Sequence, residues 1–75
     1  MTERQAIQKL NESILYAKNK HPEFPESPEE GFSIICEEML ELCRAINDAE
    51  SNDRMIEEAL HVAVTAIRFV ETRLK

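Results

Sequence analysis

Acidic residues in the middle of the sequence stand at a spacing that suits metal binding. Glu38 and Glu41 are three residues apart, and Glu37 directly precedes them. On a helix such positions differ by roughly 60°, so both carboxylates project from one side. The neighbours of Glu38 on the helical projection are apolar: Ile34, Leu42 and Ala45. A carboxylate in such surroundings usually has a paired charge or an ion beside it.

A second polar ridge follows near the C-terminal end, at spacings of three, four and three residues: Glu58, His61, Thr65 and Arg68. Antiparallel packing of two helices would bring this ridge to face the first group. Carboxylate oxygens suit Mg²⁺ or Mn²⁺, which are the usual partners of a triphosphate. Such an ion would neutralise phosphate oxygens and help to activate water for attack on phosphorus. Arg68 would face the bound anion.

The same residues also fit an ordinary solvated helix face. Glu-x-x-Glu pairs arise by chance in a Glu-rich chain, so spacing alone favours neither reading of the carboxylates. A lone histidine such as His61 is more often a boundary residue than a ligand. Thr65 and Arg68 are also typical of helical surface pairs.

Three helices are predicted to position these residues within one domain, residues 1–75. Apolar residues recur at helical spacing over three segments, at about residues 3–19, 28–48 and 54–74. All three prolines lie between residues 21 and 28, which predicts a stiff connector there. We expect Phe24, in this connector, to fold back onto the helices.

Each predicted helix has a start signal. Thr2-Glu-Arg-Gln5 has the form of a capping box, and Ser27 followed by Pro28 is typical of a helix N-terminus. Asn52 or Asp53 is expected to cap the third helix.

Composition and length indicate an all-α protein that associates with itself. The 75 residues are 43% hydrophobic and 32% charged with a single glycine, which favours helices. A lone core of this size supplies only roughly 3–5 kcal/mol. The apolar arc of the third helix covers more than half of its circumference, which implies two partner surfaces. We expect the second helix on one surface and a second subunit on the other, so that a helical bundle core forms by homo-oligomerisation, as a homo-dimer or tetramer.

Net charge and hydropathy argue against two classes of partner, nucleic acid polymers and membranes. A formal net charge of −6 disfavours nucleic acid polymers, and no apolar run approaches the ~20 residues that cross a bilayer. With no signal-peptide pattern at the start, the sequence predicts a cytoplasmic protein without a membrane partner.

The two cysteines are not expected to form a disulfide. Cys36 and Cys43 are about 10 Å apart along one helix, which is too distant for that bond. We expect them to be small buried hydrophobic residues.

Around the carboxylates, the sequence resembles the all-α nucleoside triphosphate pyrophosphohydrolases of the MazG and dimeric dUTPase type. Their signature is Glu-Glu-x-x-Glu on one helix and Glu-x-x-Asp on the next. Here the first half reads Glu37-Glu38-Met-Leu-Glu41 and the second reads Glu57-Glu58-Ala-Leu-His61. Over about residues 27–71 the sequence is similar to those of short MazG-like proteins of phages and other mobile elements.

The resemblance implies a function and a set of site residues. It implies Mg²⁺- or Mn²⁺-dependent cleavage of an NTP or dNTP to a monophosphate and pyrophosphate, by an active enzyme or a degenerate relative. Carried over by position, Glu38, Glu41 and Glu58 would bind metal, and Glu37 would help to bind metal or activate water. The fourth position holds His61, a neutral nitrogen ligand that suits Mg²⁺ poorly but accepts Mn²⁺, Fe²⁺ or Zn²⁺.

Two other functional classes remain open. Glu58-x-x-His61 matches the Glu-x-x-His element of carboxylate-bridged di-iron bundles, and a dimer would supply that element twice. Alternatively, the bundle is a non-catalytic dimerisation or partner-binding module in which the carboxylates are residual. Metal-dependent stabilisation separates this module from the metal-binding classes.

Overall fold

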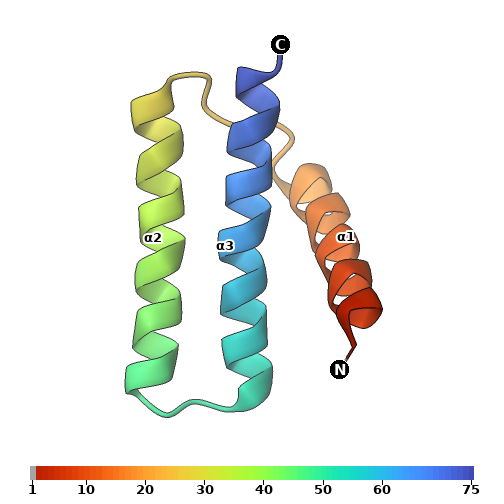
Figure 1. Cartoon of the computed structure of the whole chain (residues 1–75). Helices are drawn as coiled ribbons and strands as arrows, with labels where there is room; N and C mark the ends of the chain where they lie inside the picture. The colour runs from red at the N-terminus through yellow and green to blue at the C-terminus, as the bar shows by residue number, and fades with distance from the viewer. Residues whose placement is uncertain (1) are drawn as a thin grey trace.

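The protein consists of three α-helices. The computed structural model describes residues 2–75, and within that range the regular structure comprises α1 (Glu3–Lys20), α2 (Pro28–Asn47) and α3 (Asn52–Arg73), without strands. α2 and α3 form an antiparallel hairpin, and α1 lies beside α3 at an angle to it (Figure 1). α1 contacts α3 and does not contact α2. The all-helical prediction is therefore confirmed for the described residues.

Side-chain caps fix the starts of α1 and α2 where the sequence predicts them. The hydroxyl of Thr2 accepts a hydrogen bond from the Gln5 N–H at 3.3 Å, and the Gln5 side chain accepts one from the Thr2 N–H at 2.8 Å. Ser27 caps α2 by accepting a hydrogen bond from the Glu30 N–H at 3.2 Å, with Pro28 in the first turn. These bonds satisfy backbone donors that the helices leave unpaired.

The cap of α3 differs from the expectation. Ser51, and not Asn52 or Asp53, accepts the hydrogen bond from the Arg54 N–H at 3.2 Å, so the helix begins two residues earlier than predicted. The extended backbone of Ser51 leaves its hydroxyl free to turn back toward the helix. Asp53 then lies in the first turn, where its negative charge interacts favourably with the helix dipole.

The turn between α2 and α3 is short because α2 ends in a Schellman motif. The Glu50 N–H donates to the Ala45 carbonyl at 3.0 Å and the Ala49 N–H to the Ile46 carbonyl at 3.1 Å. Ala49 occupies the left-handed position, with φ of 51°, that glycine usually fills. This reversal sets α3 directly beside α2.

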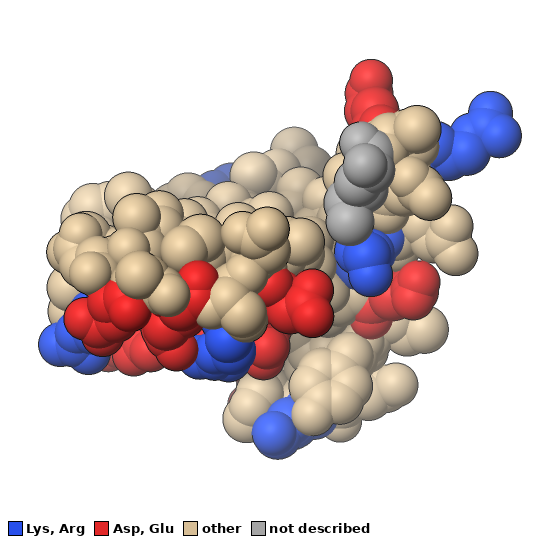
Figure 2. Space-filling view, turned by 90° about the horizontal axis from the view of Figure 1, so that it is seen from below, with Lys and Arg blue, Asp and Glu red and all other residues tan. Residues whose placement is uncertain are grey.

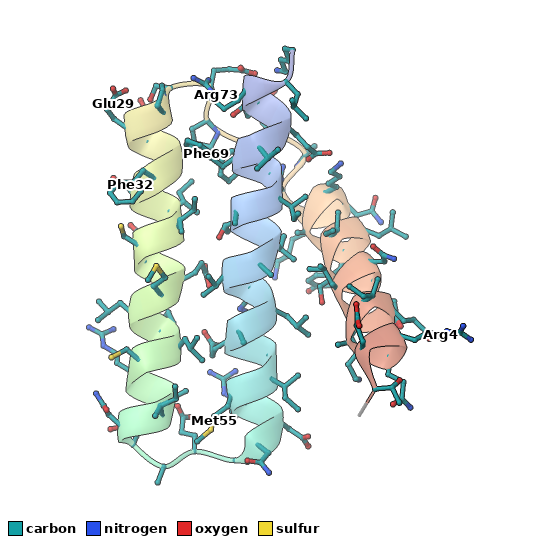
Figure 3. All side chains as sticks on the ribbon, viewed as in Figure 1. Arg4, Glu29, Phe32, Met55, Phe69 and Arg73 are labelled. Atoms are coloured by element: carbon teal, nitrogen blue, oxygen red, sulfur yellow. The ribbon has the colours of Figure 1, made fainter. Side chains whose placement is uncertain are left out.

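The connector before α2 is pinned to the C-terminal half of α3. An Arg68 N–H donates to the His21 carbonyl at 2.7 Å, and Arg73 donates to the Glu26 carbonyl. Phe24 is half-buried, as expected for a residue that folds back onto the helices. Its ring and the ring of Phe69 lie against Gly31, which has no side chain to displace them. In Figure 3 Phe69 lies between α2 and α3.

We expect Gly31→Val to destabilise the protein. A Cβ atom at residue 31 would lie 2.9 Å from Phe69 Cδ2 and 3.2 Å from Phe24 Cε2, so both rings would have to shift. Overpacking of this kind costs about 1–3 kcal/mol, more than the helix propensity that valine gains over glycine. Urea unfolding measures the change, and Ser33→Val, at an exposed site on the same helix, is the control. Equal midpoints for the two variants would contradict this packing role.

The described residues bury very little apolar surface. Ala45 and Val64 are the buried apolar side chains, while the charged residues Glu58 and Arg68 are also buried. Both cysteines are exposed, which corrects the expectation that they would be buried. Periodicity identifies an apolar face, but it does not say whether the same chain covers that face.

The packing of α1 against α3 was not predicted from the sequence. The expected contact of α3 with a second subunit stays a prediction. A further apolar line on α3, with Ile56, Ile67 and Val70, stays exposed. None of the helices described is long and apolar enough to cross a membrane.

Candidate functional site

Three potential metal ligands converge where α2 and α3 pack together. Glu38 lies near the middle of α2, and Glu58 and His61 lie one turn apart on α3. Antiparallel packing brings one ligand atom of each within 4.8 Å of the others. We refer to these three residues as the acidic cluster. Two ligand atoms bound to one ion at about 2.0–2.2 Å lie about 3–4 Å apart, so a small closure would suffice to hold a cation.

Within the acidic cluster, the histidine lies between the two carboxylates. His61 Nδ1 lies 3.6 Å from Glu38 Oε2 and 3.8 Å from Glu58 Oε1, which is too long for direct hydrogen bonds. The side chains are 45% exposed for His61, 29% for Glu38 and 6% for Glu58. The cluster is therefore largely desolvated at Glu58 and open to solvent at His61.

Electrostatics at Glu38 favours the arrival of a positive charge. Desolvation raises the pKa of Glu38, His61 lowers it, and the charges of Glu58, Glu41 and Glu37 raise it further. Because burial and repulsion outweigh the histidine, the ionised carboxylate lacks adequate compensation. A cation bound here would supply that compensation.

An arginine that sequence reasoning missed compensates the other carboxylate. Arg54 lies 3.1 Å from Glu58 Oε1 and 3.1 Å from Glu57 Oε2, and 3.7 Å from Glu50 Oε1. Its ion pair with Glu57 is the main cause of the raised pKa of Arg54. The sequence does contain a signal for this ion pair. Arg54 stands four residues before Glu58, and this spacing places the two side chains on one helix face.

Two of the carboxylates predicted for the site lie outside the acidic cluster. Glu41 is exposed and lies 3.8 Å from Arg44, and Glu37 is exposed on the same helix. Gly31 and Ala45, each seven residues from Glu38, are both buried, so this line faces α3. Glu41 lies roughly 60° from that line. Glu37 and Glu41 influence Glu38 through their charge and not through contact.

The acidic cluster opens onto a cleft of about 870 Å³ between α1, the connector and α3. Glu38 and His61 line one part of the cleft, and Arg68 lines another. Arg68 is only 8% exposed, with its guanidinium carbon 5.3 Å from the centre of the Phe24 ring. No carboxylate in residues 2–75 forms an ion pair with it. Its positive charge is therefore not neutralised by a carboxylate and adds a positive potential to this part of the cleft.

The α1 side of the cleft adds residues that were not predicted as site residues. Tyr16 and Lys20 line it, with the Lys20 ammonium 5.7 Å from the centre of the Tyr16 ring. Glu12 and Ser13 lie on the same wall. Their helical spacing resembles that of any amphipathic helix, so the sequence carries no signal that distinguishes them.

Comparison of the chain with protein-family models, with curated proteins and with solved structures gives no match. The likeness of residues 37–41 and 57–61 to MazG-type motifs stays a prediction from short segments. Chemically, the arrangement can hold a divalent cation at the edge of a cleft that also carries aromatic and basic side chains.

Proposed function

We propose that the protein is a metal-dependent nucleoside triphosphate pyrophosphohydrolase, as its resemblance to MazG-type enzymes implies. One observation carries the proposal: Glu38, Glu58 and His61 converge at a cleft whose wall holds the buried Arg68. Metal ligands and a guanidinium that forms no ion pair with a carboxylate, in one cleft, are what a polyanionic, metal-bound substrate needs. Such a substrate also fits a cytoplasmic protein.

The ligands of the acidic cluster favour one kind of cation. Two carboxylates and one imidazole nitrogen suit Mn²⁺, and also Fe²⁺ or Zn²⁺, better than Mg²⁺, which prefers oxygen. Glu41 would complete the coordination by turning inward, since it lies within one helical turn of Glu38. Mn²⁺ is therefore the ion that we expect to support activity best.

The cleft would hold the substrate by charge and by stacking. The net charge of −6 repels a triphosphate, so a bound cation has to neutralise the phosphates before they approach. Arg68 and Lys20 would contact the remaining phosphate oxygens. Phe24 and Tyr16 offer ring faces to a base.

The reaction would be an attack by water on the α-phosphorus. A new bond forms between the water oxygen and phosphorus, and the bond from phosphorus to the bridging oxygen breaks. Pyrophosphate would leave with that oxygen and its electron pair, and a carboxylate beside the water would accept its proton. Glu37, which the resemblance implies for this role, does not line the cleft and would have to turn inward to reach the water. A cation held by Glu38, Glu58 and His61 would supply positive charge to stabilise the phosphate oxygens.

A non-catalytic module is the second candidate, and one contact favours it. Arg54 already compensates Glu58 at 3.1 Å, so that carboxylate has a partner without any metal. In this case the acidic cluster serves only to join α2 to α3. The module predicts no response to Mn²⁺.

Pyrophosphate release from a panel of nucleoside triphosphates, in Mn²⁺ and separately in Mg²⁺, tests the proposal. We expect release by the wild-type protein, a loss of at least about a hundredfold in Glu38→Gln, and no change in Glu29→Gln. Glu29 is an exposed carboxylate in the first turn of α2 and serves as the matched control. Release that survives in Glu38→Gln, or no release with any nucleotide, would overturn the assignment.

A further inference from the structure

One carboxylate oxygen of the acidic cluster already has a positive group beside it. Arg54 Nη2 lies 3.1 Å from Oε1 of Glu58, and His61 Nδ1 lies 3.8 Å from that same oxygen. Oε1 is therefore shared between Arg54 and the acidic cluster. Because the side chain of Glu58 is only 6% exposed, water compensates its charge poorly, and Arg54 takes over that task.

A divalent cation in the acidic cluster would come close to Arg54. A metal ion bonded to Oε1 of Glu58 lies about 2.1 Å from that oxygen, so it would lie within about 5 Å of Arg54 Nη2. Two positive groups at this separation, beside a largely desolvated carboxylate, repel one another strongly. The metal ion and Arg54 therefore compete for Glu58.

Arg54 has two other carboxylates within reach. Its Nη1 atom lies 3.1 Å from Glu57 Oε2, and its Nε atom lies 3.7 Å from Glu50 Oε1. All three side chains are exposed to solvent, so the guanidinium can turn without leaving a buried site. Figure 2 views the end of the molecule that carries the α2–α3 turn, and shows acidic and basic side chains gathered along one edge of the hairpin. Glu50 and Glu57 would hold Arg54 once it has left Glu58.

We propose that Arg54 is an internal competitor of the metal ion and determines how tightly the acidic cluster binds a divalent cation. In the metal-free protein Arg54 pairs with Oε1 of Glu58. A divalent cation takes over this oxygen, and Arg54 moves onto Glu50 and Glu57. The inference rests on the metal site of the proposed function, but it requires neither catalysis nor a nucleotide.

The exchange keeps the buried carboxylate compensated in both states. Glu58 pairs with Arg54 before the exchange and with the metal ion after it, so its charge is never left alone between α2 and α3. A monovalent ion brings no more charge than the guanidinium that it would replace, whereas a divalent ion brings twice as much. Arg54 therefore makes the acidic cluster selective for divalent cations.

Calorimetric titration of Mn²⁺ into the wild-type protein and into Arg54→Met tests the proposal. Methionine keeps much of the apolar stem of the arginine and removes its charge. We expect Arg54→Met to bind Mn²⁺ at least about tenfold more tightly, a change of about 1.4 kcal/mol. An affinity that is unchanged or lower in Arg54→Met, or no binding by either protein, would overturn the proposal.

Arg4→Met is the matched control for the loss of one positive charge. Arg4 is exposed, and in Figure 3 it projects from α1 on the side turned away from α3. We expect Arg4→Met to bind Mn²⁺ as the wild-type protein does. A tenfold gain in Arg4→Met as well would show that net charge, and not the position of Arg54, sets the affinity.

The wild-type protein provides a second measurement, because Arg54→Met leaves Glu58 without a partner and should unfold more easily in the absence of metal. Turning the guanidinium toward Glu50 brings Arg54 Nε within hydrogen-bond distance of that carboxylate. We therefore expect the Arg54 Nε–H proton signal to move downfield in NMR spectra as the protein is saturated with Zn²⁺. A signal that stays in place at saturation would overturn the exchange.

Zn²⁺ replaces Mn²⁺ in the NMR experiment because its filled d shell leaves the spectra undisturbed. Both cysteines are exposed, so they are alkylated beforehand and do not bind the ion. Because neither measurement uses a nucleotide, the two proposals fail separately. Exchange of Arg54 without any pyrophosphate release would leave this inference standing and remove the hydrolase, and release combined with equal Mn²⁺ affinities would do the reverse.

Discussion

Arg68→Ala should remove about 3 kcal/mol of stability, which approaches all that a lone core of this size supplies. The substitution empties a site that is 8% exposed and breaks the hydrogen bond to the His21 carbonyl. It also removes the guanidinium from the face of Phe24. The connector and the cleft wall would lose their main attachment to α3.

Urea unfolding at one fixed protein concentration measures this loss. Arg68→Met is the matched variant, because it keeps most of the buried stem while removing the charge and the hydrogen bond. We expect its loss to be about half that of alanine, since part of the effect is packing. An unfolding midpoint of Arg68→Ala equal to that of the wild type would show that Arg68 does not anchor the connector.

Mn²⁺ should stabilise the wild-type protein by about 2.7 kcal/mol at a hundredfold excess over its dissociation constant. Glu38→Gln and His61→Ala should abolish that stabilisation, because each removes a ligand from the acidic cluster. Glu29→Gln should retain it, being remote from the cluster. Thermal unfolding with and without Mn²⁺ measures the shift, and equal shifts in the wild type and Glu38→Gln would eliminate the metal site.

Without metal, the same Glu38→Gln substitution should raise the free energy of unfolding instead of lowering it. The pKa of Glu38 is raised above 4.5, so the folded protein holds this proton more tightly than the unfolded chain does. The stability that this carboxyl contributes is present below pH 4.5 and is lost as the pH rises through the raised pKa. Near pH 7 the metal-free wild type should therefore be less stable than Glu38→Gln, whereas with Mn²⁺ the order should reverse.

The helices could be predicted from the sequence because helix starts depend on capping residues that are close neighbours in the chain. The capping box at Thr2 and the Ser27-Pro28 start are both in place. The start of α3 was misplaced because three consecutive residues, Ser51 to Asp53, are all good caps. Only the backbone conformation selects Ser51 among them.

The candidate site was predictable only in part, because its assembly depends on how two helices pack. The sequence shows that Glu38 and Glu41 share one side of a helix, but not which of them faces α3. Gly31 and Ala45, spaced seven residues to either side of Glu38, carry that information, since small buried residues mark the line of closest helix contact. The exposure of both cysteines lies beyond any pattern in one chain, because it depends on what covers the side of α2 that carries them.

The contacts of α1 also determine the order in which the molecule can assemble. α2 and α3 are neighbours in sequence, joined by a tight turn, so they can pair early through local contacts. α1 has no buried residue, and its ion pair from Lys18 to Glu71 joins positions 53 residues apart. Closing so long a loop has an entropic cost that only the few contacts of α1 offset. The cleft that α1 completes is therefore the last part of the molecule to form and the first to open.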